Sequence, residues 1–311
     1  MDAIALAEFT LGVPQLILAV PPAVPENFEA AFEAALRRRE SREPLQHILG
    51  TAAFRHLRVP VVRGVFLPRP ETEVVTQPAV DEARRLIQAG ELPLVVDLCS
   101  GSGVIGLSVA VEVPGSTVIG IDVDTVAVAA ATSAAVTAGL VRADAVRDGK
   151  VQDDELLAGD STVQDGESDG DAVRRGTSEV DGLGVGGIRF EVGDVASSDL
   201  LCDVEGAVDV VISNPPYIPD DAVPLDREVI DHDPPTALFG GGADGLDLPR
   251  RVVDVAVRLL RPGGLFVLEH ADVQGGAVRE LVERTDAFDC ATTHQDLTGR
   301  DRFVTARRRD A

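Results

Sequence analysis

The chain has 311 residues, 45% of them hydrophobic, and a formal net charge of −24. This apolar fraction excludes disorder of the whole chain, and the length favours one large domain with a smaller unit beside it. No apolar run of about 18 residues would cross a bilayer, and the three cysteines lack the spacing of a zinc site or a disulfide framework. We therefore expect a cytoplasmic protein with reduced thiols, no metal ion and no membrane partner.

The negative charge also bears on a nucleic-acid partner. Tight binding to nucleic acid needs basic side chains that neutralise phosphates, and here Lys150 is the only lysine beside 27 arginines. A local arginine patch would still permit such binding. The charge therefore argues against direct nucleic-acid binding without excluding it.

The N-terminal part predicts two helices followed by a hairpin. Residues 26–39 carry apolar side chains at helical spacing and three arginines at the C-terminal end, which suits the helix dipole, and residues 3–11 form a shorter helix before them. Residues 44–73 alternate apolar stretches with turn formers, which predicts a β-hairpin. The predicted division is a short helical domain over 1–43, a β-hairpin linker over 44–77 and a large domain over 78–311.

From residue 78 onward, short apolar strands alternate with helices. This alternation predicts an α/β fold with a doubly wound, mostly parallel sheet of seven strands. The last two strands are expected to form an antiparallel hairpin at the sheet edge. The expected strands are 92–98, 116–122, 188–192, 208–213, 264–270, 290–295 and 302–308, and the expected helices are 104–112, 124–138, 249–261 and 275–284.

Residues 141–187 interrupt this alternation. Between Asp144 and Gly187 there are twelve acidic residues against four basic ones, nine glycines and no aromatic residue. Such a segment cannot bury enough apolar surface to offset the entropy that it would lose on folding. We therefore predict a disordered acidic insertion.

A glycine-rich turn follows the first strand of the large domain. Gly101 and Gly103 let the backbone approach a ligand, and the helix after them offers free N–H groups. Asp122 ends the next strand, where a carboxylate can bind both hydroxyls of a ribose, and Asp194 after the third strand is placed either for an adenine edge or for a loop cap. The helix follows the GSG turn directly, without GxGxxG spacing, so S-adenosylmethionine is a better match than NAD.

The tetrapeptide Asn214-Pro215-Pro216-Tyr217 directly follows the fourth strand. It could be only a turn in which proline ends the strand. The chemical alternative is a site for a planar amino group, whose delocalised lone pair attacks a sulfonium methyl poorly. The Asn214 side-chain oxygen and the Pro215 carbonyl would accept its two N–H bonds and stabilise the growing charge. We predict Asn214 and Pro215 as catalytic and all four residues as substrate-binding, with Tyr217 closing the pocket.

Several segments resemble the protein-(glutamine-N5) methyltransferases of peptide chain release factors, the PrmC or HemK family. PLQHILG together with PRPETE is the most specific part, because NPPY also occurs in DNA adenine and ribosomal RNA methyltransferases. The resemblance covers about residues 26–305 apart from the acidic insertion. The segments, in the family's order, are EPLQHILGTAAF (43–54), GVFLPRPETE (64–73), VVDLCSGSG (95–103), SNPPYIP (213–219), DPPTALFGGGADGL (233–246) and RPGGLFVLEH (261–270).

This resemblance implies a Rossmann-like class I methyltransferase that uses S-adenosylmethionine to methylate the glutamine in the Gly-Gly-Gln loop of release factors. It implies a monomer whose N-terminal domain, which looks short, docks the release factor. Arg69, Glu71 and Glu73 would shape the pocket rim or merely brace the hairpin. Cys99 and the pair His232-Asp233 depart from the family's usual residues. The implied cofactor-binding residues are Cys99, Ser100, Gly101, Ser102, Gly103, Asp122, Asp194, Val195 and Asn214.

Two other functions remain open from the sequence. A nucleic-acid methyltransferase that acts on adenine or guanine amines would share the amine chemistry, but it needs a basic groove. A non-catalytic S-adenosylmethionine-binding partner of the translation machinery would have no use for a preorganised amide acceptor. Both alternatives are therefore weaker than release-factor methylation.

Overall fold

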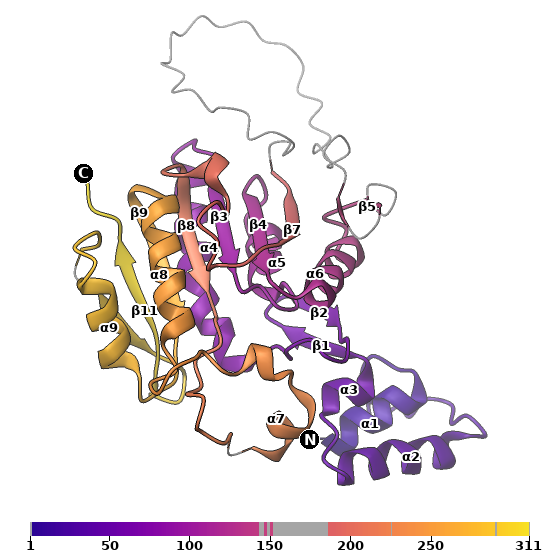
Figure 1. The fold of residues 1–311 in the computed structure, drawn as a ribbon. Coiled ribbons are helices and arrows are strands. Elements are labelled where there is room, and N and C mark those ends of the chain that lie inside the picture. Colours follow the sequence, from indigo (N-terminus) through magenta and orange to yellow (C-terminus); the bar gives the residue numbers. More distant parts are fainter. Residues whose placement is uncertain are drawn as a thin grey trace, which may run out of the picture.

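The computed structural model describes residues 2–142, 146–147, 150–151, 186–224, 226–289 and 291–310 (Figure 1). Most of the predicted acidic insertion over 141–187 lies outside these residues, so its disorder stays a prediction. The part of it that is described includes a short antiparallel pair, β5 (Val146–Arg147) and β6 (Lys150–Val151). None of the described helices is long and apolar enough to cross a membrane.

Three helices form a small N-terminal unit, drawn in indigo beside the larger body (Figure 1). They pack around Leu6, Ala35 and Ile48, each from a different helix. The Arg39 guanidinium joins the ends of two helices, since it donates to the Asp2 carboxylate at 2.7 Å. The helices are α1 (Asp2–Leu11), α2 (Phe28–Glu40) and α3 (Leu45–Leu49).

The segment between this unit and the sheet is only partly a hairpin. Strands β1 (Thr51–Phe54) and β2 (Leu57–Pro60) pair in antiparallel register. Helix α4 (Pro70–Gln88) then begins with a proline at its first position, where the missing N–H costs no helical hydrogen bond. This helix runs through the predicted boundary between residues 77 and 78, so that boundary is not a break in secondary structure, and the domain division stays a prediction.

The larger body is built on a seven-stranded sheet, as predicted. The strand order is β10-β11-β9-β8-β3-β4-β7, and only β11 runs against its neighbours. The α/β class, the parallel core and the antiparallel edge hairpin are thus confirmed. The strands are β3 (Leu94–Leu98), β4 (Thr117–Asp122), β7 (Ile188–Val192), β8 (Val208–Ser213), β9 (Leu260–Glu269), β10 (Thr292–Gln295) and β11 (Asp301–Arg307).

Helices cover both faces of the sheet because successive side chains of a strand point to opposite faces. Val95 of β3 packs among residues of α4, α5 and α6, whereas its neighbour Val96 packs among residues of α8 and α9. Both valines are fully buried, so each face has its own apolar core. The remaining helices are α5 (Val104–Glu112), α6 (Thr125–Thr137), α7 (Arg227–His232), α8 (Asp247–Leu259) and α9 (Gly275–Glu283), with 3-10 turns η3 (Cys202–Val204) and η4 (Pro235–Ala237).

The strand order creates a ligand site at a defined place. After β3 the chain continues through α5 on one face of the sheet, and after the adjacent β8 it continues to α8 on the other. In open α/β sheets, ligands bind where neighbouring connections diverge in this way, outside the carboxyl ends of the strands. The loops after β3, β4, β7 and β8 are therefore where a site is expected.

Candidate functional site

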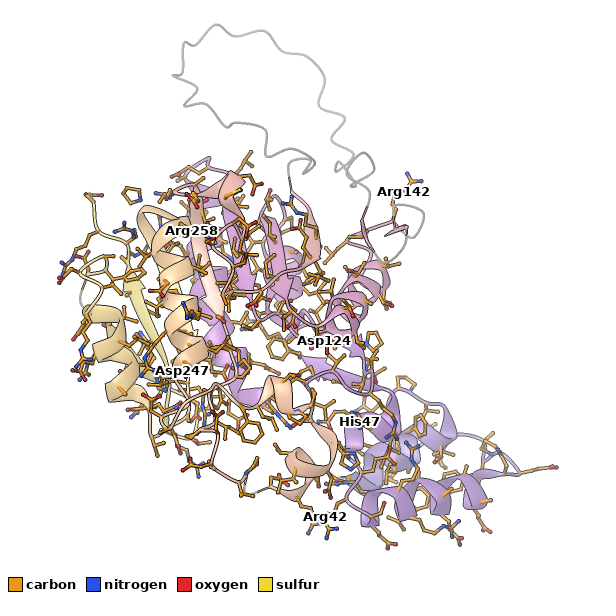
Figure 2. All side chains as sticks on the ribbon, in the orientation of Figure 1. Arg42, His47, Asp124, Arg142, Asp247 and Arg258 are labelled. Carbon is orange, nitrogen blue, oxygen red and sulfur yellow. The ribbon has the colours of Figure 1, made fainter. Side chains whose placement is uncertain are left out.

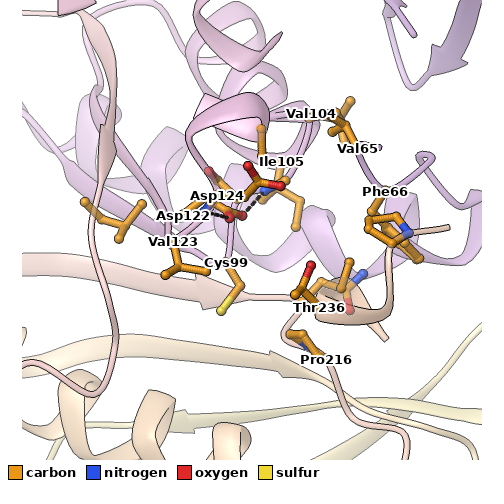
Figure 3. A pocket seen from close by; sticks show the side chains of 18 of the residues that line it. Val65, Phe66, Cys99, Val104, Ile105, Asp122, Val123, Asp124, Pro216 and Thr236 are labelled. Carbon is orange, nitrogen blue, oxygen red and sulfur yellow. Dashed lines mark hydrogen bonds between the residues drawn. The ribbon is translucent and has the colours of Figure 1, made fainter. Parts of the chain in front are cut away.

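A cavity opens at this point, with about 960 Å³ of space including its mouth (Figure 3). Apolar side chains such as Val65, Phe66 and Val123 form part of its wall. Of the residues predicted from the sequence, the cavity wall includes Cys99, Ser100, Gly101, Ser102, Asp122, Asp194, Val195, Asn214 and Pro216, but not Gly103, Pro215 or Tyr217.

The turn after β3 curls tightly over one side of this cavity. Cys99, Gly101 and Gly103 all have positive φ angles, of 57°, 54° and 77°. A Cβ on Gly101 would meet nothing within 4 Å, whereas a Cβ on Gly103 would lie 2.6 Å from the Phe190 ring. Gly101 therefore leaves room for a ligand, while Gly103 allows the turn to pack on β7. Cys99 adopts the left-handed conformation that the family's usual glycine adopts more readily.

Asp122 ties this turn to the end of β4. Its carboxylate accepts hydrogen bonds from the Gly101 amide at 2.7 Å and from the Asp124 amide at 2.9 Å. Asp124 in turn caps α6, since its side chain accepts from Val126 N at 2.7 Å (Figure 2). Each Asp122 oxygen keeps a free lone pair that can accept a further hydrogen bond.

The cavity has an excess of negative charge. Its lining carries Asp122, Asp124 and Asp194 against one basic residue, Arg69, which is ion-paired to the buried Asp233. Burial raises the pKa of Asp122, because no cationic group among the described residues compensates the charge of this buried carboxylate. A cationic ligand is therefore suited to the cavity. Among the described residues, no group of three or more His, Cys, Asp or Glu side chains is arranged to hold a metal ion.

Two buried polar groups lie near the turn: Ser100, which the sequence predicted as cofactor-binding, and Asp97, which it did not. Asp97 lies under the turn with no exposed surface; one of its oxygens accepts from Gly106 N at 3.0 Å and the other has no partner among the described residues. Burial raises the pKa of Asp97 to about 7. The Ser100 hydroxyl also lacks a protein partner and belongs to the cavity wall. The Ser100 hydroxyl, which lines the cavity without a protein partner, can bond to a polar ligand.

The tetrapeptide after β8 places two acceptor oxygens side by side in sequence. The Asn214 side chain is half-buried at the cavity, and its Nδ2 donates to the Thr72 hydroxyl at 3.3 Å. Neither the Asn214 Oδ1 nor the Pro215 carbonyl accepts a hydrogen bond from any described residue. Asn214 lines the cavity, so its oxygen can meet a ligand there. Pro215 is buried and outside the cavity wall, so the contact of its carbonyl with a substrate N–H bond stays a prediction.

Tyr217 does not line the cavity. Its backbone N–H donates to Leu238 O at 3.2 Å, and its carbonyl accepts from the Gln274 side chain at 2.9 Å. Burial, followed by the charge of nearby Glu269, raises the pKa of its hydroxyl. Tyr217 is partly exposed and outside the cavity wall, so its role as the residue that closes the pocket stays a prediction.

The glycine-rich segment after α7 braces the tetrapeptide, a role that sequence analysis did not assign. Gly240 N donates to Ile218 O at 2.9 Å, and a short bridge joins Ile218 to Phe239. A Cβ on Gly245 would lie 2.2 Å from the Tyr217 carbonyl oxygen. The two backbones are thus in direct contact, which only glycine permits.

Replacing Gly245 by alanine should therefore destabilise the fold more than the same change at Gly263. The two glycines have φ of 73° and 75°, but a Cβ on Gly263 meets nothing within 4 Å. We expect Gly263→Ala to lower the free energy of unfolding by about 1 kcal/mol and Gly245→Ala by about 2–4 kcal/mol, because only the latter adds overpacking. Urea unfolding of both variants measures this, and equal losses would contradict the bracing contact.

The loop that contains α7 joins the N-terminal unit to the cavity. Glu228 accepts a hydrogen bond from Arg39 at 2.7 Å, and the His232 ring packs edge-on against His47, 5.7 Å between centroids. Further along, Asp233 pairs with Arg69, whose guanidinium lies 4.9 Å from the centre of the Phe66 ring. Of the PRPETE side chains, Pro68, Arg69 and Thr72 line the cavity, and Glu71 and Glu73 do not.

The sheet order and the cavity at its switch point are those of Rossmann-like class I methyltransferases that use S-adenosylmethionine. The chain is 39% identical over 281 residues to a release factor glutamine methyltransferase of Bifidobacterium longum, covering 89% of this chain and 80% of the relative. It is 37% identical to one of Mycobacterium leprae, covering 100% of this chain and 90% of the relative. The chain therefore belongs to the release factor glutamine methyltransferase family.

One family model and one relative with a different printed substrate also match the chain. Residues 1–50 match the family model described as PrmC N-terminal domain. A 4-amino-L-phenylalanine/4-methylamino-L-phenylalanine methyltransferase of Streptomyces pristinaespiralis is 34% identical, covering 83% of this chain and 71% of the relative. S-adenosylmethionine, whose sulfonium is positively charged, fits the acidic cavity described above.

Proposed function

We propose that this protein transfers a methyl group from S-adenosylmethionine to the side-chain amide nitrogen of the glutamine in the Gly-Gly-Gln loop of peptide chain release factors. The names of its relatives support the substrate. The observation that carries the chemistry is the pair of unpartnered acceptors, the Asn214 Oδ1 and the Pro215 carbonyl oxygen. A primary amide has two N–H bonds, which these two oxygens would accept.

Asn214 and Pro215 would lower the barrier by orientation and charge stabilisation. The lone pair of an amide nitrogen is delocalised, and the bound cofactor supplies a methyl group that is activated by a sulfonium. Fixing both N–H bonds holds the nitrogen in one orientation and stabilises the positive charge that develops as its bond to carbon forms. The alkylated nitrogen becomes acidic and loses one proton, so no strong base is required. Pro216, which lines the cavity, would contact the substrate beside them.

The cofactor-binding residues are proposed from the same geometry. Asp122 would bind the ribose hydroxyls through its free lone pairs, and Asp194 and Val195 would contact the adenine. The turn from Cys99 to Gly103 would hold the methionine part, with Ser100 as a hydrogen-bonding partner. Asn214 would lie between the cofactor and the substrate.

The setting of the reaction is also proposed. We infer a cytoplasmic monomer that binds the release factor protein and makes no direct contact with nucleic acid, which the net charge of −24 supports. The N-terminal helical domain would dock the release factor. The N-terminal domain contacts the α7 loop, and this loop also lines the cavity. This proximity supports a docking role for the domain.

Methyl transfer from labelled cofactor tests this function directly. The protein is incubated with a bacterial release factor, with total RNA, and with free 4-amino-L-phenylalanine, in separate reactions. We expect label on the release factor and none in the other two. Label in RNA or on the free amino acid, with none on the release factor, would contradict the proposal. Cofactor binding without any transfer would indicate a non-catalytic binding protein.

A further inference from the structure

Thr72 lies between Asn214 and a buried carboxyl group. The Thr72 side chain is 3% exposed, and its hydroxyl oxygen accepts the hydrogen bond from Asn214 Nδ2 at 3.3 Å. Glu269, at the end of β9, is 2% exposed, and hydrogen bonding from the Thr72 side chain acts to lower the pKa of its carboxyl group. Three polar groups from α4, the loop after β8, and β9 therefore form a chain that ends at the cavity.

Glu269 itself has few partners. Its Oε2 accepts no hydrogen bond from the described residues although it is buried. The charged or titratable groups that face it are Glu71 on α4, Tyr217 after β8 and Arg302 on β11, and Arg302 is already paired to Asp296. A buried carboxylate with so little compensation destabilises the fold, so its presence calls for a functional reason.

The direction of hydrogen bonding in this chain decides which atom Asn214 presents to the cavity. An ionised carboxylate only accepts, so the Thr72 hydroxyl must donate its single proton to Glu269. The Thr72 oxygen can then only accept, so the NH₂ of Asn214 faces Thr72 and Oδ1 faces the cavity. A protonated Glu269 can instead donate to Thr72, and Thr72 can donate to Oδ1, which turns the NH₂ toward the cavity.

We propose that Thr72 and Glu269 are positioning residues that hold the Asn214 amide with its oxygen toward the substrate. This inference rests on the proposed function, because only a substrate N–H bond makes that orientation productive. Glu269 acts through Thr72 and touches neither substrate nor cofactor. Ionised Glu269 keeps the site active, and protonation releases the amide to turn.

The orientation should therefore depend on pH near neutrality. Burial raises the pKa of Glu269 to about 7, partly offset by the Thr72 hydrogen bond and by Arg302. Above this pH the carboxylate is ionised and kcat is at its plateau, and kcat falls as the pH drops through about 7. The same shift works in the opposite direction on stability: a carboxyl group with a raised pKa favours the protonated fold, so its unfavourable contribution is largest above pH 7.

Three variants test the proposal with release factor as substrate. Thr72→Val removes the hydroxyl at nearly constant volume, Glu269→Gln removes the ionisation, and Thr72→Ser keeps the hydroxyl. We expect the first two to lower kcat about two- to tenfold at pH 8, since an amide that adopts both orientations spends half or more of its time in the wrong one. Both should also lose the fall in kcat below pH 7, with little change in the KM for the cofactor, and Thr72→Ser should regain what Thr72→Val loses.

A structural role would move other quantities. Glu269→Gln should raise the melting temperature at pH 8 while it lowers kcat, because the neutral side chain avoids the buried charge. The double variant should lose no more activity than either single one, since both act on one orientation. Thr76→Val is the matched control, because Thr76 is also buried on α4 but donates only to Thr72 O at 2.8 Å. Its kcat and pH profile should match the wild type.

The outcomes separate this inference from the function it rests on. Wild-type enzyme that methylates release factor, with Thr72→Val and Glu269→Gln unchanged in kcat and pH profile, would overturn the positioning role alone. Parallel loss of kcat and melting temperature in Glu269→Gln would also overturn it. No methyl transfer by the wild type would overturn both.

Discussion

Asn214→Ala is expected to lower kcat by about a hundredfold or more while the dissociation constant of S-adenosylmethionine changes little. The substitution removes one of the two oxygens that would accept the substrate N–H bonds, and losing one preorganised charge-stabilising group typically costs this much. The loss falls on kcat because the acceptor matters most when charge develops on the nitrogen. Single-turnover methyl transfer and calorimetric cofactor titration measure the two quantities.

Two comparisons make this result interpretable. Asn214→Asp keeps an acceptor oxygen but replaces the NH₂ that donates to Thr72, so we expect activity below the wild type and above Asn214→Ala. The melting temperature of each variant separates chemistry from folding, since Asn214 is half-buried and ends no helix. An Asn214→Ala enzyme that folds and keeps more than about a tenth of wild-type kcat would contradict the acceptor role.

Asp122→Ala should instead weaken cofactor binding by about a hundredfold to a thousandfold. The carboxylate would make two charge-assisted hydrogen bonds to the ribose, each contributing about 1.5–3 kcal/mol before losses in the turn. The turn is also affected, because Asp122 accepts from Gly101 N and Asp124 N. Calorimetric titration with S-adenosylmethionine measures the change.

Asp124→Asn is the matched control for Asp122. Asp124 also lines the cavity, but its side chain caps α6, and asparagine caps as well as aspartate. Since Asp124→Asn removes one negative charge from the cavity wall but no proposed ribose contact, we expect a much smaller loss of cofactor affinity than for Asp122→Ala. If Asp122→Ala binds the cofactor normally, or if both variants weaken binding equally, Asp122 does not carry the ribose contact.

The sequence predicts those parts of the site that depend on local order along the chain. A glycine-rich turn after a buried strand and a carboxylate at the end of the next strand must meet at one sheet edge, and Asp122 indeed accepts from Gly101 N. The same holds for Asn214, which directly follows β8 beside β3. Parallel pairing places the carboxyl ends of neighbouring strands at one sheet edge, so it brings such residues together independently of the loop conformations.

The sequence could not predict contacts that depend on how distant elements dock. Thr72 lies 142 residues before Asn214, and the two meet because α4 packs on β8 and β9. Tyr217 is the last residue of the tetrapeptide, yet it does not line the cavity, and the charge of Glu269 contributes to the raised pKa of its hydroxyl. The DPPTALFGGGADGL segment resembles the family, but the sequence assigns it no structural role. In the structure, Gly245 of this segment packs against the Tyr217 carbonyl.

The departures from the family pattern also gain a physical meaning. Asp233 pairs with Arg69, whose guanidinium lies over Phe66 at the cavity wall. His232 packs against His47 of the N-terminal unit. The α7 loop is therefore held by the N-terminal unit on one side and by the cavity wall on the other.

The position of the transferred methyl group tests the central claim most directly. Release factor is treated with the protein and S-adenosylmethionine, digested, and analysed by tandem mass spectrometry. The account predicts a single added methyl group, on the side-chain nitrogen of the glutamine in the Gly-Gly-Gln loop, and its loss with Asn214→Ala. A methyl group on another residue or at the peptide backbone, or an unchanged product with Asn214→Ala, would contradict it.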